Sequence, residues 1–221
     1  MKIEVIIPVA QYDMAISLLG QIDRNITVPS DVHVIDNTGK THVWTLPNNH
    51  NLHFYNSTTG RLNESWEIAR AQLSPDTDFV TFMNDDIIIG KWFFQRVVDT
   101  FSIDRSIGIV VPKLVSSPEE VAPGPVNYNQ PPHYILEAAA FTIKKSVLDK
   151  IPPVPWQRVT TFYGDNWMWA HTRDQGYCIM QDTGNCMYHY VGVTVLERGF
   201  RTIKKKEYNE WGQIKKEVWG R

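Results

Sequence analysis

The 221-residue sequence is poor in cysteine, in long apolar runs and in net charge. Two cysteines, Cys178 and Cys186, are too few for a disulfide scaffold and lack the spacing of a zinc finger, so a reducing cytoplasm is the expected location. No stretch approaches the roughly 20 consecutive apolar residues of a membrane span. The formal net charge of −2 excludes a protein that coats nucleic acid through a global excess of basic residues.

Apolar residues, by contrast, are plentiful: 43% of the chain is hydrophobic and 12% is aromatic. This composition supports a buried core and excludes a disordered or fibrous protein. The opening stretch, MKIEVIIPVA, carries one lysine and a short apolar run, which is typical of a buried strand and not of a signal peptide. At this length, one domain with two lobes is the simplest expectation.

Short β-branched runs alternate with helical stretches in the first half of the chain. Strands are predicted at residues 3–9, 32–35, 52–55 and 79–83, and helices over 14–22 and 63–73, with Asn63 as a helix cap. This βαβαβ pattern predicts a mostly parallel α/β sheet. Such sheets bind ligands at the carboxyl ends of their strands, where Asp36 and Asp86 lie.

The second half of the chain is less regular. The proline-rich segment 116–133 predicts a long loop, a feature that is more often functional than decorative. Strands are predicted at residues 107–111, 138–143, 178–181 and 187–191, and helices over 145–150 and 165–175. From Lys204 onward the tail is charged, and its apolar residues recur at roughly helical spacing.

The acidic tip, which consists of Asn84, Asp85 and Asp86, follows directly on an apolar strand. Two adjacent carboxylates repel one another unless a positive charge lies beside them. A divalent cation that is shared with phosphate oxygens would supply that charge. The alternative is a solvated turn in which one aspartate caps the following helix. The tip alone favours neither reading.

Two further residues have both a functional and a structural interpretation. Asp165 opens a helix among aromatic residues, a setting that can raise the pKa of a carboxylate toward that of a useful base, but helix-opening aspartates are also common caps. His189 lies in an apolar strand, where histidine is usually a core residue, although its neutral imidazole is also a metal ligand.

The motifs follow one another in an informative order. Asp36 at a strand end, the segment 60–63 (Gly-x-x-Asn) and the acidic tip come first; Asp165 and His189 come later. This order resembles the family-2 glycosyltransferases over residues 3–195. The resemblance implies a single domain of GT-A fold, with a mostly parallel central sheet. Residues 1–100 would bind the nucleotide-sugar, residues 101–200 the acceptor, and residues 201–221 would form a charged tail.

On the donor side, the resemblance implies contacts with a nucleotide-diphosphate sugar. Asp36 would bind the nucleobase, with Pro8 and Val9 lining the same pocket, and Arg61 would approach the base or the diphosphate. Asn84 and Asp85 would lie near the ribose and the sugar.

The resemblance also implies a catalytic centre. Asp86 would hold a divalent metal, Mn²⁺ or Mg²⁺, and His189 would be a second ligand of that metal or would contact the diphosphate. Asp165 would be the general base that deprotonates the acceptor hydroxyl. One base and one metal imply a single displacement with inversion. The sequence departs from the family where a Glu-Asp pair reads Gly164-Asp165, so the base is a single carboxylate, and the role of a family arginine in the same helix has no assigned residue.

An inverting, metal-dependent glycosyltransferase is therefore the expected function. The alternatives are a sugar-phosphate nucleotidyltransferase and a non-catalytic carbohydrate- or nucleic-acid-binding module of the same fold. The nucleotidyltransferases usually have a glycine-rich loop with Arg and Lys after the first strand, and Gln11-Tyr12-Asp13 does not supply it. The acceptor is left open between a saccharide and modified DNA. The basic run 204–206 is either a solvated face or a contact for an anionic acceptor.

Overall fold

The computed structural model of the chain describes residues 1–27, 29–40, 42, 44, 51–57, 59–121, 128–129, 139–190 and 200–220. The strands are β1 (Ile3–Val9), β2 (Asp31–Asp36), β3 (Asn51–Asn56), β4 (Phe79–Met83), β5 (Ile87–Ile89), β6 (Ile107–Val115), β7 (Tyr128–Asn129), β8 (Ala140–Lys144) and β9 (Cys178–His189). The helices are α1 (Tyr12–Asp23), α2 (Leu62–Arg70), α3 (Phe93–Ile103), the 3₁₀ turn η1 (Pro118–Glu120), α4 (Lys145–Leu148), α5 (Gly164–Asp174) and α7 (Phe200–Trp219).

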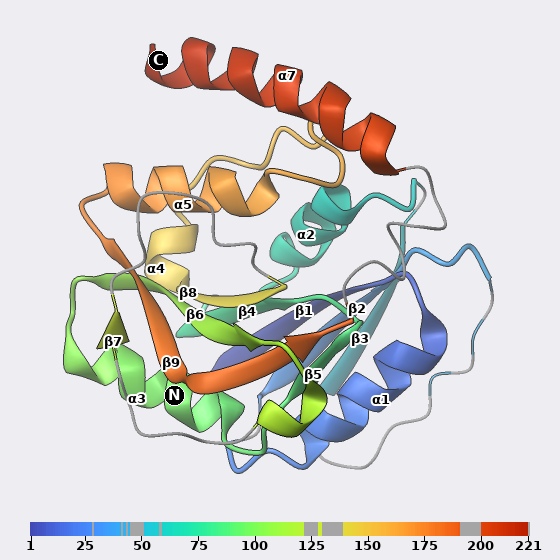
Figure 1. Cartoon of the computed structure of the whole chain (residues 1–221), viewed down its shortest axis with the longest axis vertical. Helices are drawn as coiled ribbons and strands as arrows, with labels where there is room; N and C mark the ends of the chain where they lie inside the picture. Colours follow the sequence, from blue (N-terminus) through green and yellow to red (C-terminus); the bar gives the residue numbers. More distant parts are fainter. Residues whose placement is uncertain are drawn as a thin grey trace.

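One curled sheet lies between two helical layers (Figure 1). Its strand order is β3-β2-β1-β4-β8-β6-β9-β5, and β7 pairs with β9. Helices α1 and α3 pack on one face of the sheet, in a core that contains Leu18 and Phe94. Helices α2, α4 and α5 cover the other face, where Trp66 and Trp169 are buried. All seven residues of β1 are buried, as expected for a central strand that is covered on both faces.

The prediction of a mostly parallel sheet is only partly right, because the sheet is mixed. Strands β1 to β4 pair in parallel, as the βαβαβ pattern predicts. Strand β8 then runs antiparallel to both β4 and β6, and β5 runs antiparallel to β9. An apolar run reveals that a strand is buried, but it carries no information on the direction of that strand.

Several local predictions are also corrected by the structure. The two strands predicted around residues 178–181 and 187–191 form one strand, β9, and Val191 lies outside the described residues. Strand β5 and helix α3 were not predicted. Asn63 is not the N-cap of α2, because Arg61 holds that position. Of the segment 116–133, the structure describes η1 and β7, and most of the remainder lies outside the described residues.

The charged tail is a 20-residue helix, α7, that lies across the outside of the α5 layer (Figure 1). Trp211 and Ile214 are buried in the core shared with α2 and α5, which agrees with the helical spacing of the apolar residues. Trp219 contacts Trp167 and His171, so the end of α7 packs on α5. Among the described residues, no helix is both long enough and apolar enough to cross a lipid bilayer.

Candidate active site

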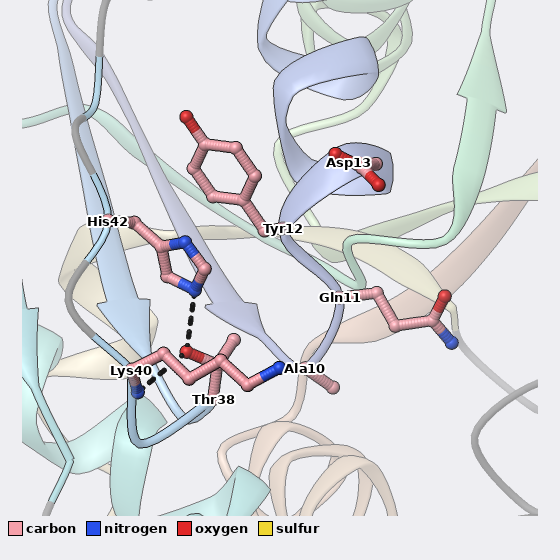
Figure 2. Close-up of a pocket in the computed structure, with 7 residues that line it drawn as sticks. All are labelled: Ala10, Gln11, Tyr12, Asp13, Thr38, Lys40 and His42. Carbon is pink, nitrogen blue, oxygen red and sulfur yellow. Dashed lines mark hydrogen bonds between the residues drawn. The ribbon is translucent and has the colours of Figure 1, made fainter.

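A pocket of about 410 Å³ opens at the carboxyl ends of β1 and β2 (Figure 2). It is lined by Ala10, Gln11, Tyr12, Asp13, Thr38, Lys40 and His42. The volume falls within the range of sites for small molecules. The pocket lies where open α/β sheets bind ligands, because the loops that follow parallel strands meet at one edge of the sheet.

Aromatic rings form one wall of this pocket. Tyr12 stacks on His42 with a centroid distance of 4.2 Å and an interplanar angle of 10°, and Trp44 meets Tyr12 edge-on. The imidazole of His42 is held by a 2.9 Å hydrogen bond between Nε2 and Thr38 Oγ1, which Figure 2 shows as a dashed line. With Lys40 beside it, the wall offers flat apolar surface and one positive charge.

Asp36 shapes the loop that carries three of the seven lining residues, Thr38, Lys40 and His42. It is the last residue of β2, is 6% exposed, and accepts a 2.8 Å hydrogen bond from the amide of Thr38. In the sheet it pairs with Val9. Pro8 and Val9 are buried in β1, and the pocket is lined by the residues that directly follow them, beginning with Ala10.

Asp85 ties the acidic tip to the wall of the pocket. Its Oδ2 accepts hydrogen bonds of 2.7 Å from the amides of both Ala10 and Gln11, at the start of α1. Burial, together with the charge of Asp86, raises the pKa of Asp85 to about 6, although the hydrogen bonds from the two amides act in the opposite direction. One of its oxygens is thus already engaged by the chain itself.

Asp86 and His189 meet although 103 residues separate them. Asp86 Oδ1 lies 3.1 Å from His189 Nε2, and the Asn84 amide nitrogen lies 3.5 Å from the same Nε2. The sheet produces this contact, because Ile87 of β5 pairs with His189 of β9 and the amide of Tyr190 donates to the carbonyl of Asp86. The acidic tip and the imidazole therefore converge.

An irregularity in β9 precedes this contact. The pairing of β9 with β6 jumps between Asp182 and Cys186, which marks a bulge. Asp182 is completely buried and forms an ion pair of 2.9 Å with Arg96 of α3, and it also accepts hydrogen bonds from Thr100 and from the amide of Gly184. This network anchors the bulge from which the strand continues to His189.

Asp86 and His189 offer a carboxylate oxygen and an imidazole nitrogen, a donor set that suits Mn²⁺ or Mg²⁺ when phosphate oxygens and water complete the shell. Asp86 is buried, with 8% of its side chain exposed, whereas 22% of the His189 side chain is exposed. Within the part of the chain that the structure describes, no group of three His, Cys, Asp or Glu residues forms a metal cage. The two side chains fit a metal site that depends on a bound diphosphate.

Asp165 is the second residue of α5, is partly buried, and accepts a 2.8 Å hydrogen bond from the amide of Asn166. The first turn of α2 links this helix start to the carboxyl end of β2: Asn63 donates to the carbonyl of Phe162, and Ser65 donates to the side chain of Asn37. The segments that contain Asp36 and Asp165 are therefore linked, through Asn37 and Phe162, by one helical turn.

Arg61 caps the same helix, α2, and is exposed. Close packing explains why Gly164 stands where the resemblance implies a glutamate. A Cβ at this position would lie 2.2 Å from Asn63 Oδ1 and 2.7 Å from Trp66. A side chain there would force its neighbours to shift.

Sequence reasoning missed the residues that line the pocket. Tyr12 could have been found, since it follows the first strand by three residues, where ligand-binding loops of α/β sheets begin. Lys40 and His42 follow β2 in a stretch without any periodic pattern, so no signal in the sequence distinguishes them.

No protein-family model and no curated protein matches the sequence. Solved structures do match. S. aureus TarS (residues 1–349), in complex with UDP, has a TM-score of 0.66 at 16% identity, over 93% of this chain and 65% of that one. The mannosyltransferase PcManGT from Pyrobaculum calidifontis, in complex with GDP-Man and Mn²⁺, has a TM-score of 0.65 at 13% identity, over 96% and 64%.

GalNAc-T7, with UDP, GalNAc and Mn²⁺, gives a TM-score of 0.66 at 10% identity, over 86% of this chain and 44% of that one. The chain thus spans less than two thirds of the length of each of these three proteins. At these identities the likeness is one of fold, and it confirms the GT-A-like architecture that the order of the motifs implies.

Proposed function

We propose that the chain is a glycosyltransferase that moves a sugar from a nucleotide-diphosphate sugar to an acceptor hydroxyl with inversion. The observation that carries the proposal is the 3.1 Å contact between Asp86 and His189, which the neighbouring Asp85 links to the wall of the pocket through the amides of Ala10 and Gln11. The neighbours that share the fold support it, since TarS is in complex with UDP and PcManGT with GDP-Man and Mn²⁺.

The donor binds in the half formed by residues 1–100. The Tyr12–His42 wall stacks on the base and Asp36 hydrogen-bonds its edge, while Pro8 and Val9 hold the strand end beneath it. Flat rings suit this task because every base has an apolar face.

The phosphates, the ribose and the sugar of the donor lie along two basic side chains and the acidic tip. Lys40 and the exposed Arg61 approach the phosphates, and Asn84 and Asp85 contact the ribose and the sugar. Asp86 and His189 would hold a divalent cation, and such an ion would supply the Lewis-acid neutralisation that a departing diphosphate needs.

Asp165 acts in the acceptor half, residues 101–200. Its carboxylate takes the proton of the acceptor hydroxyl while the oxygen of that hydroxyl attacks the anomeric carbon on the face opposite the diphosphate. A single displacement inverts the anomeric centre and needs no second carboxylate as a nucleophile.

The donor is identified by thermal shift of the wild-type chain with UDP-, GDP-, dTDP- and CMP-sugars, each with and without Mn²⁺. We expect one nucleotide to stabilise the chain, and Mn²⁺ to enlarge that shift. In Asp86→Ala the part that depends on Mn²⁺ should disappear. A shift that is identical in Asp86→Ala would contradict the metal site.

The base is tested with Asp165→Asn on the donor so identified. We expect turnover to fall by about 10²–10⁴-fold while the nucleotide-induced shift stays unchanged. The control is Asp149→Asn, an exposed carboxylate that pairs with Lys145 and lies after α4. Full turnover in Asp165→Asn would remove Asp165 as the base. A wild type that binds donor but never releases nucleotide would favour the binding module.

A further inference from the structure

The loop of residues 159–163, which leads into α5, is held from one side by a buried carboxylate of α7. Glu207 is 2% exposed. It accepts hydrogen bonds from three consecutive backbone amides: those of Thr160 at 2.9 Å, Thr161 at 3.2 Å and Phe162 at 2.8 Å. It also accepts a 2.5 Å bond from the hydroxyl of Thr160. Both carboxylate oxygens take part.

The carbonyls of the same loop are held by a different helix, α2. The side-chain amide of Asn63 donates to the carbonyls of Val159 at 2.7 Å and Phe162 at 3.0 Å, and its backbone amide donates to the carbonyl of Thr160. Helix α2 thus donates hydrogen bonds to the carbonyls of the loop, and helix α7 accepts hydrogen bonds from its amides. A non-regular segment is fixed in this way without any strand or helix of its own.

Helix α7 is itself firmly docked where it carries Glu207. Trp211, one turn further along, stacks on Tyr163 at 5.8 Å with an interplanar angle of 11°. Arg158, just before the loop, forms ion pairs with Glu210 and Glu217 of α7. The carboxylate is therefore delivered by a helix that is fixed by contacts over the turns that follow Glu207.

The residue that follows the clamped amides has an unusual backbone. Tyr163 has φ of 66°, and it is the one non-glycine residue with positive φ in the part of the chain that the structure describes. This conformation is unfavourable for a bulky side chain and persists only where the surroundings impose it. It turns the chain into Gly164, which packs directly on Asn63, and Asp165 comes next.

We propose that Glu207 is a positioning residue for Asp165. By fixing the amides of residues 160–162 it imposes the turn at Tyr163, and that turn sets where the first helical residues of α5 lie. The inference rests on the proposed function, because it assigns the turn a role in placing the catalytic base. Catalysis is sensitive to such placement, since a shift of about 1 Å in a reacting group can lower the rate about 100-fold.

The first test needs no ligand. In Glu207→Gln the side chain keeps its size, but one acceptor oxygen becomes an N–H donor that faces the backbone amides. We expect amide hydrogen exchange in the peptide that covers residues 159–166 to become at least about tenfold faster than in wild type. The matched control is Glu210→Gln, which lies on the same helix and removes a partly exposed partner of Arg158. Exchange that is unchanged in Glu207→Gln overturns the inference.

The second test separates positioning from folding. With the donor found by thermal shift, Glu207→Gln should lower kcat by about 10- to 100-fold while the nucleotide-induced shift and the KM for donor stay within twofold of wild type. Glu207→Asp, which keeps both oxygens on a shorter stem, should recover part of kcat. Glu210→Gln should be unaffected in both.

The outcomes distinguish the two proposals. If Asp165→Asn is inactive and Glu207→Gln turns over like wild type, only the inference about Glu207 fails. If Asp165→Asn is fully active, the proposed base fails and the inference fails with it. A loss of donor binding in Glu207→Gln that parallels its loss of kcat shows a general fold defect and overturns the positioning role.

Discussion

The first and the second half of the molecule are built by different kinds of contact. In residues 3–83, parallel strands pair in the order β3-β2-β1-β4, so backbone pairing brings the loops that follow these strands to one edge of the sheet. From the acidic tip onward, contacts join residues far apart: Asp86 with His189, Arg96 with Asp182, and Glu207 with Thr160. The first half builds its pocket from loops at strand ends, whereas the second half places side chains through long-range polar contacts.

The largest loss of stability is expected where such a long-range polar contact is buried. Asp182→Ala leaves Arg96 largely buried beside an apolar side chain, and loss of one partner of a buried ion pair costs about 3–5 kcal/mol. Urea denaturation followed by fluorescence should report this loss. The control is Asp99→Ala, an exposed carboxylate on the same helix as Arg96, for which we expect a change within about 0.5 kcal/mol. Equal, small changes in both would contradict the anchoring role of Asp182.

The next effect concerns the close approach of α5 to α2. Gly164→Ala puts a Cβ 2.2 Å from Asn63 Oδ1, so a buried helix start must move. Overpacking of this kind destabilises by about 2–3 kcal/mol. A thermal melt gives the loss of stability, and hydrogen exchange in the peptide 159–166 shows where the structure yields. If Gly164→Ala melts like wild type, the two helices are not packed as closely as the distances require.

These contacts mark the limit of what the sequence reveals. The strands at residues 3–9 and 79–83 could be predicted to the residue, because β-branched runs end at polar turns. The reversal of β8 could not, since a short apolar run has the same appearance in either direction. The meeting of Asp86 with His189 is implied by the order of the motifs alone, and no local pattern near either residue indicates it.

Glu207 is a residue whose direction the sequence predicts but whose partners it does not. A charged residue in a lysine-rich helix is ordinarily assigned to solvent. Its spacing with Trp211 and Ile214, four and seven residues further on, would place it on the inward face of the helix. The pattern therefore predicts that Glu207 faces inward. The three amides that make a buried carboxylate favourable belong to residues 160–162, and nothing in the sequence indicates that these residues contact α7.

A smaller effect is expected in the first half, at a buried carboxylate that also has long-range partners. Glu4 is 1% exposed and accepts hydrogen bonds from His33 at 2.8 Å, the amide of Ser74 at 3.1 Å and the hydroxyl of Thr77. Burial raises the pKa of Glu4, but the hydrogen bonds from His33, Thr77 and Ser74 outweigh it and lower the pKa below its ordinary value of 4.5. The ionised form is therefore the one that stabilises the fold.

The sign of the pH dependence follows from this lowered pKa. Glu4→Gln should lose about 1–2 kcal/mol at pH 7, where the wild-type group is ionised in both the folded and the unfolded chain. The difference between wild type and variant should hold down to about pH 5 and shrink as the pH falls through the folded pKa. Urea denaturation at pH 7, 5 and 3.5 measures it. A difference that grows toward acid pH would contradict the lowered pKa.

The smallest effect, and the only stabilising one, is expected in the middle of α7. Gly212 has no atom within 4 Å of the position where a Cβ would lie, so Gly212→Ala adds a methyl group to open space. Alanine favours a helix over glycine by about 1 kcal/mol, which corresponds to a rise of about 2–4 °C in Tm for a chain of this size.

A glycine here weakens the helix that carries Glu207, so the docking of α7 rests on its inward side chains more than on its own propensity. Gly212→Ala should then slow hydrogen exchange at residues 160–162 as well as in α7. If Tm rises while exchange at residues 160–162 stays unchanged, the loop of the second half is held independently of the stability of the helix that contacts it.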